Sequence, residues 1–248
     1  MSAQRIVSLA PSITEILFAL GLEPRVVGVT EICDYPPAAR RKPKVGDYQI
    51  SPEKVVALKP DLVVAHEVLN ARVIPVLKRL GLRVLHANPN RFEKLYAFIH
   101  AIGAATGTER EASRLTRAMR ARVERVRRQL PKRRPSAMFV ISLEPLWAAG
   151  RDTFADELMT LAGARNALAS AFSGFKPVSL EAALGSSPEI ILLAGPKADA
   201  VLTHPRWQRT PAVRNRRVHE LNPDWVLRES PRSVNGLEQI AACVRQEA

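Results

Sequence analysis

Short apolar runs alternate with mixed polar and apolar stretches along the first ninety or so residues. Ile6, Val7 and Leu9 form a run that Pro11 ends, so a buried strand is predicted over residues 5–9. The same pattern predicts further strands over residues 25–29, 62–65 and 82–86 and helices over residues 13–20, 51–58 and 73–80. Strands that alternate with helices in this way are typical of a parallel α/β sheet.

Individual residues mark the ends of these elements. Ser51, Pro52 and Glu53 form a helix start, with a capping hydroxyl, a proline suited to the first turn and a carboxylate that favours the helix dipole. Pro60 ends that helix, and Gly21 stands where a glycine is expected after a helix. The alternation of helices and strands is therefore supported by local signals as well as by the apolar pattern.

Three segments of the first half return, in the same order, in the second half. They are VSLAP at 7–11 with ISLEP at 141–145, EIL at 15–17 with ELM at 157–159, and SPE at 51–53 with SLE at 179–181. A serine and a proline stand nine residues apart in both copies, at Ser51 and Pro60 and at Ser179 and Pro188. This self-similarity predicts two similar α/β lobes.

The stretch between the two lobes has the composition of a helix. Residues 108–130 contain no proline or glycine and are rich in Ala, Arg, Glu and Leu. A helix of that length would span about 34 Å at ~1.5 Å per residue. We expect an α/β protein of two similar lobes with mainly parallel sheets, joined by one long, stiff helix. The N-terminal α/β lobe is predicted over 1–107, the connecting helix over 108–131 and the C-terminal α/β lobe over 132–248.

The net charge is the unusual feature of the composition. The chain has 37 Lys and Arg against 24 Asp and Glu, which gives a net charge of +13. Much of the excess lies between Arg110 and Arg134, mostly on the predicted connecting helix, where a charged surface is the ordinary solvated face. This segment has no interleaved aromatic residues that could stack on bases. We therefore expect no nucleic-acid partner.

The cysteines and the start of the chain leave the cellular compartment open. Cys33 and Cys243 form no CxxC motif and no zinc spacing, and free thiols are favoured over a bridge between them. No apolar run approaches the ~18–20 residues of a membrane helix. The first residues lack the basic and then apolar build of a secretion signal, so either the protein is cytoplasmic or a leader has been removed.

Sequence signatures of catalysis are absent. The chain contains no G-x-S-x-G elbow, no Walker loop, no G-x-G-x-x-G and no H-E-x-x-H motif. Its five histidines are scattered without metal-ligand spacing. We expect a non-enzymatic protein with no catalytic residues, no cofactor and no metal site.

The candidate binding residues follow predicted strands. Open parallel sheets bind ligands beyond the carboxyl ends of their strands. The residues at such positions are Ile32 and Tyr48 after the second strand, His66 and Glu67 after the strand at 62–65, Trp147 after Pro145, and Asp224, Trp225 and Arg228 after a strand predicted at 217–221. Aromatic residues make up only 5% of the chain, so their placement in several predicted strand-exit loops is selective. Flat side chains at such places favour a cleft for a bulky, partly apolar ligand.

The chain resembles one known class of proteins along essentially its whole length. That class is the iron-siderophore/vitamin B12 class of ABC-importer substrate-binding proteins, and within it the chain is most similar to the cobalamin-binding component. The resemblance rests on RIVSLAPSITEILFALG, GVTEICDYPP, VGDYQISPEKVVALKPDLVVAH, EPLWAAG, VSLEAALGSSPEIILLAG and DWVLRESPR. It implies two Rossmann-like lobes joined by a rigid backbone helix, with the ligand held between them.

The resemblance also implies roles for single residues. In similar cobalamin binders, the segment that matches Asp224-Trp225-x-x-Arg228 touches the corrin, and here it is intact. Aromatic residues occupy the positions of Tyr48 and Trp147 in those proteins.

Two ligand positions depart from the family pattern, and the docking positions match it only approximately. Ile32 stands at a usual contact position but is aliphatic rather than aromatic, and His66 stands where tryptophan is expected. The imidazole could approach the cobalt of a corrinoid or the iron of a haem, or it could hydrogen-bond a side chain of the ligand. Acidic residues on each lobe usually dock such proteins onto arginines of the permease, and Glu67 and Glu229 lie near those positions.

The expected function is that of a monomeric substrate-binding protein outside the cytoplasm, in the periplasm or at the cell surface. It would capture cobalamin or another corrinoid and deliver it to the permease of an ABC importer. A ferric-siderophore or haem binding protein of the same fold is the first alternative. The second is a cytoplasmic corrinoid-handling α/β protein or enzyme, which the missing leader and the charge of +13 favour.

Overall fold

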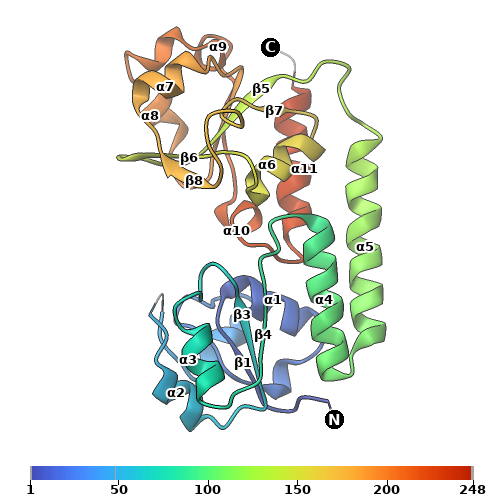
Figure 1. Cartoon of the computed structure of the whole chain (residues 1–248). Coiled ribbons are helices and arrows are strands. Elements are labelled where there is room, and N and C mark those ends of the chain that lie inside the picture. Colours follow the sequence, from blue (N-terminus) through green and yellow to red (C-terminus); the bar gives the residue numbers. More distant parts are fainter. Residues whose placement is uncertain (1, 48, 247–248) are drawn as a thin grey trace. The chain divides into compact units, whose positions relative to one another are not determined.

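The chain folds into two compact units that are joined through one helix. The computed structural model describes residues 2–47 and 49–246. The first unit ends at Met119 and the second begins at Arg120. Both residues belong to helix α5 (Glu109–Arg127), so the chain passes from one unit to the other without a loop (Figure 1).

The first unit is built on a parallel sheet. Its elements are β1 (Ile6–Ser8), α1 (Pro11–Ala19), the 3-10 helix η1 (Glu23–Arg25), β2 (Val26–Gly28), the 3-10 helix η2 (Pro37–Arg41), α2 (Pro52–Ala57), β3 (Leu62–His66), α3 (Ile74–Arg79), β4 (Val84–Ala87) and α4 (Phe92–Thr106). The strands lie in the order β2-β1-β3-β4, with parallel pairing throughout this path. Figure 1 shows α2 and α3 on one side of the sheet and α1 and α4 on the other. Strands β1 and β3 are buried along their whole length because helices cover both faces.

The second unit is built on a mixed sheet. Its elements are β5 (Ser136–Leu143), β6 (Leu146–Ala149), α6 (Phe154–Leu161), β7 (Arg165–Asn166), β8 (Phe175–Pro177), α7 (Leu180–Gly185), β9 (Ile190–Leu193), α8 (Ala198–Leu202), the 3-10 helix η3 (Trp207–Arg209), α9 (Pro211–Arg214), β10 (Val218–Glu220), α10 (Pro223–Val226) and α11 (Ser233–Arg245). The strand order is β10-β9-β5-β6-β8, with β7 beside β5. Strands β10, β9, β5 and β7 pair in parallel, whereas β6 and β8 add an antiparallel edge. The predicted α/β class is confirmed, and the antiparallel edge is a feature that the sequence analysis did not predict.

The internal repeat of the sequence is visible in the helix ends of both units. The Ser51 hydroxyl accepts a backbone hydrogen bond at the start of α2, and the Ser179 hydroxyl does the same at the start of α7. After α1 and α6 the chain turns at Gly21 and Gly163, whose φ angles of +76° and +89° are left-handed and favour glycine. The matched sequence segments therefore form matched local structures.

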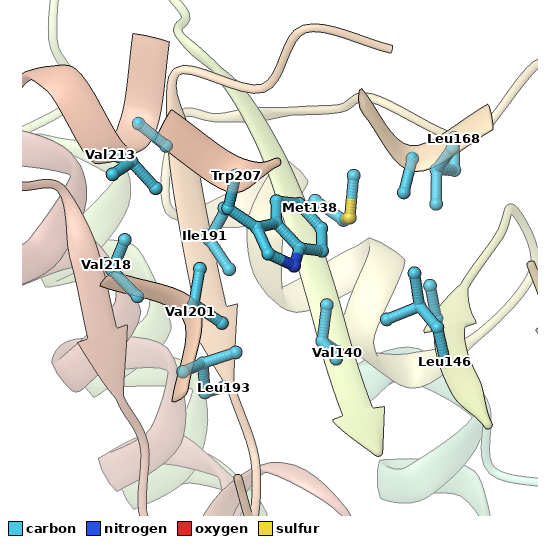
Figure 2. Close-up of a cluster of buried hydrophobic side chains, with 13 residues drawn as sticks. Met138, Val140, Leu146, Leu168, Ile191, Leu193, Val201, Trp207, Val213 and Val218 are labelled. Atoms are coloured by element: carbon cyan, nitrogen blue, oxygen red, sulfur yellow. The ribbon is translucent and has the colours of Figure 1, made fainter. Parts of the chain in front are cut away.

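One face of the second sheet packs on a buried cluster around Trp207. The residue comes from η3 and is 3% exposed. Figure 2 shows its indole over β5 and β9, close to Met138 and Ile191. Side chains of α7, α8 and α9 complete the cluster. The opposite face is packed as well, since Phe139, Ile190 and Leu192 are fully buried, so the strand ends are left to carry other functions.

Helix α5 is attached to each unit by separate contacts. A Cβ added at Gly103 of α4 would lie 2.9 Å from the Ala112 Cβ, so α4 and the first half of α5 are in close contact. In the second half, Arg122 donates to the carboxylate of Glu238 on α11 at 3.0 and 2.6 Å and to Asn235 Oδ1 at 2.6 Å. Each half of α5 is therefore an integral part of its own unit.

Both cysteines are buried free thiols, as the sequence analysis predicts. The Cys33 sulfur lies within hydrogen-bond distance of the hydroxyls of Thr14 and Thr30, at 3.1 and 3.0 Å. Among the residues that the structure describes, no helix combines the length and the hydropathy that a membrane crossing requires.

Candidate functional site

The last residue of β3 is a buried histidine with a defined proton position. His66 is 5% exposed, and its Nδ1 accepts hydrogen bonds from the backbone N–H groups of Val68 and Leu69 at 3.2 and 3.3 Å. A ring nitrogen that accepts carries no proton, so the neutral imidazole holds its proton on Nε2. Burial lowers the pKa of His66 to about 4, and the ring is therefore neutral at pH 7.

The turn after β3 is fastened to the neighbouring strand by Asn70. The Asn70 Oδ1 accepts the His66 N–H at 2.8 Å, and its Nδ2 donates to the Leu9 carbonyl, just after β1, at 3.1 Å. This buried amide joins the carboxyl ends of two adjacent strands. The sequence analysis did not identify Asn70, since an asparagine four residues after a strand gives no sign of the distant carbonyl that it contacts.

A groove of about 660 Å³ with mixed polar and apolar walls lies beside this turn. Its walls come from the segments that follow β2 and β3, and they are formed by Gln49, Ile50, Pro52, Val68, Leu69, Asn70, Ala71, Arg72, Val73 and Val76. Val68 and Leu69 are 61% and 59% exposed, which is unusual for two adjacent apolar side chains. Their backbone N–H groups are the ones that His66 accepts, so the histidine shapes the exposed apolar wall of the groove.

The remaining expected ligand residues of the first unit lie on the segment after β2. Ile32 is half-buried and precedes the fully buried Cys33. Tyr48 lies outside the described residues. The structure therefore places His66 directly behind the groove and Ile32 elsewhere on the carboxyl side of the sheet.

Trp147 lies in a strand and not in a strand-exit loop, so the predicted element is wrong. Strand β5 reverses through Glu144 and Pro145, and β6 returns antiparallel with Trp147 opposite Ser142. Leu146 and Ala148 enter the buried cluster around Trp207. Because side chains alternate along a strand, the half-buried Trp147 lies on the opposite face of the sheet.

The segment after β10 forms a short helix held by an ionic cluster. Asp224 Oδ1 lies 3.0 Å from the guanidinium of Arg228, and its Oδ2 lies 3.8 Å from that of Arg232. Both arginine side chains are less than one-fifth exposed. The adjacent Trp225 is half-buried. The structure thus brings Asp224 and Arg228 together and adds Arg232, which the sequence analysis missed because it reaches Asp224 across the loop between α10 and α11.

A glycine of α11 allows this segment to pack closely. A Cβ added at Gly236 would lie 2.5 Å from the carbonyl oxygen of Trp225 and 2.8 Å from a methyl group of Val226. Glycine costs about 1 kcal/mol in a helix interior relative to alanine. At this position it permits the backbone of α10 to pack directly against α11, and this contact positions the backbone of Trp225.

The two expected docking carboxylates differ in their surroundings. The Glu67 side chain is 57% exposed, and its Oε2 lies 3.8 Å from His86 Nδ1. Glu229 is half-buried, and burial raises the pKa of its carboxyl group to about 7. At neutral pH Glu229 therefore carries only part of a negative charge.

A second pair of carboxylates occupies equivalent positions in the repeat. Glu53 and Glu181 both stand in the first turn of their helices, α2 and α7, and both are exposed. A hydrogen bond from the Ser51 hydroxyl lowers the pKa of Glu53, and a hydrogen bond from Arg206 lowers that of Glu181. Both are ionised at neutral pH. The signal for them was present in the sequence as SPE and SLE.

The titratable residues of the described chain do not gather as a metal site. No group of three or more His, Cys, Asp or Glu side chains is arranged to hold an ion within residues 2–47 and 49–246. The arrangement is suited to holding a molecule against apolar and aromatic surfaces, which is a binding chemistry.

Two α/β units, each with candidate binding residues beyond the carboxyl ends of its parallel strands, are typical of a two-lobed substrate-binding protein. The chain belongs to the periplasmic binding protein family, whose model matches residues 6–225. It is 37% identical to the uncharacterized ABC transporter substrate-binding lipoprotein YvrC of Bacillus subtilis strain 168, over 97% of this chain and 80% of that protein.

Two solved structures are similar over nearly the whole chain. One is the crystal structure of the periplasmic vitamin B12 binding protein of Vibrio cholerae, with a TM-score of 0.90, 29% identity and coverage of 98% of this chain and 97% of that one. The other is that of a periplasmic haem binding protein from Pseudomonas aeruginosa, with a TM-score of 0.84, 29% identity and coverage of 98% and 92%.

Family membership confirms the class predicted from the sequence. The chain is a substrate-binding protein of the ABC importer type, and proteins of this family carry ligands without transforming them and deliver them to an importer permease. Family members are periplasmic proteins or lipoproteins.

Proposed function

We propose that the cargo of this binding protein is a corrinoid of the vitamin B12 type. The observation that carries the proposal is the hydrogen bonding of His66. Its Nδ1 accepts two backbone N–H groups, so Nε2 is the protonated nitrogen of a neutral ring. In this state Nε2 is a hydrogen-bond donor of the kind that suits the amide side chains at the rim of a corrin. It is buried in the structure, so a corrin amide would reach it only after the turn at Val68 and Leu69 moves.

The same observation argues against haem. A neutral imidazole that ligates iron through Nε2 carries its proton on Nδ1, where it donates to a carbonyl or carboxylate. In this protein Nδ1 faces two N–H donors instead. Ligation by His66 would require both of these hydrogen bonds to break.

The second unit supports a flat, bulky cargo. Trp225 stands beside Asp224, which is held by Arg228 and Arg232, and Trp147 lies on the sheet face away from the Trp207 cluster. Aromatic side chains that are fixed in this way can cover a macrocycle without a large loss of side-chain entropy. The similarity to the vitamin B12 binding protein of Vibrio cholerae agrees with this cargo.

Haem is the alternative cargo, and one specific observation favours it. The haem binding protein from Pseudomonas aeruginosa is as similar in sequence as the vitamin B12 binding protein, with 29% identity in both cases. Ferric siderophores belong to the same class of ligands and are included in the test.

Calorimetric titration of the purified protein with cyanocobalamin, hemin and a ferric siderophore distinguishes these cargoes. We expect tight binding of cyanocobalamin only. Trp225→Ala should weaken it by about 1–3 kcal/mol, or roughly 5- to 150-fold, whereas Trp225→Phe should keep most of the affinity because it retains a ring. Preferential binding of hemin, with a change of its absorption spectrum that His66→Asn abolishes, would replace the corrinoid proposal by haem.

For docking onto the permease we infer a role for Glu53 and Glu181. They are equivalent in the internal repeat, exposed and ionised, so a symmetric pair of arginine sites on a permease could receive both. Glu67 remains a candidate for the first unit, but Glu229 is a weaker one because its carboxyl group is half-buried and partly protonated.

Transport assays with the cognate permease in proteoliposomes test this inference. Glu53→Gln with Glu181→Gln should reduce uptake without changing cargo affinity. The double variant Glu67→Gln with Glu229→Gln is the matched comparison, because it also removes one carboxylate from each unit. If uptake falls only in the second pair, the docking role passes to Glu67 and Glu229.

A further inference from the structure

Four cationic side chains line a cavity of about 660 Å³ in the second unit. They are Lys132 and Arg133 from the segment after α5, Arg217 from the residue before β10, and Arg245 from the end of α11. The other lining residues are Gln129, Pro131, Pro135, Val244 and Gln246. None of the lining residues is acidic.

This cavity lies at the edge of the sheet that the cargo site does not use. Pro135 directly precedes β5, and Arg217 directly precedes β10, so both mark the amino ends of parallel strands. Trp225 follows the carboxyl end of β10. Figure 1 shows α11 running to the C-terminal end of the chain, on the same unit. The cationic cavity is therefore separate from the cargo residues of this unit.

Arg217 is held in place but is not satisfied by the protein. Its Nη2 donates to the carbonyls of Cys243 and Val244, at 3.3 and 3.1 Å, in the last turn of α11. Its Nε is buried and has no hydrogen-bond partner within residues 2–47 and 49–246. A buried donor without an acceptor is unfavourable, and the planar guanidinium is suited to an oxyanion.

The other cations leave most of the charge uncompensated. Arg133 pairs with Glu189 at 2.6 Å, and Arg245 donates to the neutral amide of Gln129 at 3.1 Å. Lys132, Arg217 and Arg245 form no ion pair with a carboxylate of the described residues. Like charges that converge on one cavity repel each other, and an anion bound among them would relieve this repulsion.

We propose that this cavity is a binding site for a phosphate group, carried either by a free phosphate compound or by the headgroup of an anionic phospholipid. The arginines offer paired N–H donors for the phosphate oxygens, and Lys132 adds a mobile ammonium group at the rim. The volume exceeds that of one phosphate ion, which favours a diphosphate or a headgroup. The site is distinct from cargo capture, so its occupant does not depend on which ligand is transported.

Titration with pyrophosphate in about 0.15 M salt tests the site, because long-range attraction is screened over ~8 Å under these conditions. Lys132→Gln with Arg245→Gln removes two exposed cations of the cavity. Arg110→Gln with Arg114→Gln removes two exposed cations of α5 and is the matched control. We expect at least tenfold weaker pyrophosphate binding in the cavity variant and less than a twofold change in the control. Circular dichroism verifies that both variants are folded.

Vesicle sedimentation distinguishes the source of the phosphate. Vesicles of phosphatidylglycerol and of phosphatidylcholine are mixed with the wild-type protein and both variants. Binding of pyrophosphate supports a free phosphate compound. Binding to phosphatidylglycerol alone, lost in the cavity variant and kept in the control, supports a headgroup. Absence of both, or equal loss in both variants, overturns the proposal, since charge alone would then account for any binding.

Discussion

The buried imidazole of His66 makes the first unit sensitive to acid, and His66→Asn should remove that sensitivity. The unfolded chain protonates a histidine near its ordinary pKa of 6.5, whereas the folded protein does so at a pKa of about 4. Between these values the unfolded state holds more protons, so the free energy of unfolding decreases as the pH decreases. The full difference corresponds to about 3 kcal/mol, of which about 2 kcal/mol is lost between pH 7 and 4.5.

The assay has to report on the first unit alone. All tryptophans of the chain, Trp147, Trp207 and Trp225, belong to the second unit, so fluorescence does not follow the unfolding of the first. Hydrogen exchange followed by mass spectrometry, on peptides from residues 62–80, reports on it directly. In His66→Asn the new carbonyl oxygen can still accept backbone N–H groups of the turn, but it does not titrate.

The comparison is the loss of protection between pH 7 and 4.5, corrected for intrinsic exchange. We expect the free energy of opening derived from this protection to fall by about 2 kcal/mol more in the wild type than in His66→Asn. His100→Asn is the control, because His100 is exposed on α4 of the same unit and its replacement should leave the acid response unchanged. An acid response in His66→Asn equal to that of the wild type would refute the burial and the proton position assigned to His66.

The remaining predictions concern the second unit, and urea unfolding followed by tryptophan fluorescence measures them. The pKa of Glu229 is raised from 4.5 to about 7, so the folded state holds more protons in this range and the free energy of unfolding should decrease by about 2–3 kcal/mol as the pH rises through it. Glu229→Gln should abolish that decrease, and an unchanged pH profile would contradict the burial of this carboxyl group. Gly236→Ala should destabilise the unit by about 1–3 kcal/mol, because its Cβ would meet the carbonyl of Trp225, and calorimetric titration should also show weaker cargo binding. Trp207→Ala should cost about 3–5 kcal/mol, and a cost below 1 kcal/mol would show that the cluster of Figure 2 is not packed as described.

The features that the sequence predicted well are those determined over a few residues. The caps at Ser51 and Ser179 depend on an N–H group three residues away, and the left-handed glycines on the end of the preceding helix. Such spacings can be recognised in a chain before its tertiary contacts are known.

The features that the sequence did not predict depend on distant partners. Trp147 lies in a strand because β6 folds back on β5 and is joined on its other side by β8, about thirty residues further on, and a four-residue apolar run gives little sign of that second pairing. Asn70 is defined by the carbonyl of Leu9, and Gly236 by the backbone of Trp225. These side chains support the site through contacts that only the fold creates.

The continuity of α5 across both units has a consequence for how this chain can vary in length. An α-helix turns by about 100° and advances ~1.5 Å with each residue. A single residue inserted between Met119 and Arg120 would therefore turn everything after it by about 100°, with no loop at that point to absorb the change. Seven inserted residues would restore the orientation to within ~20° while adding about 10 Å. Insertions and deletions in α5 are thus expected to be tolerated in evolution only when they add or remove close to whole helical turns.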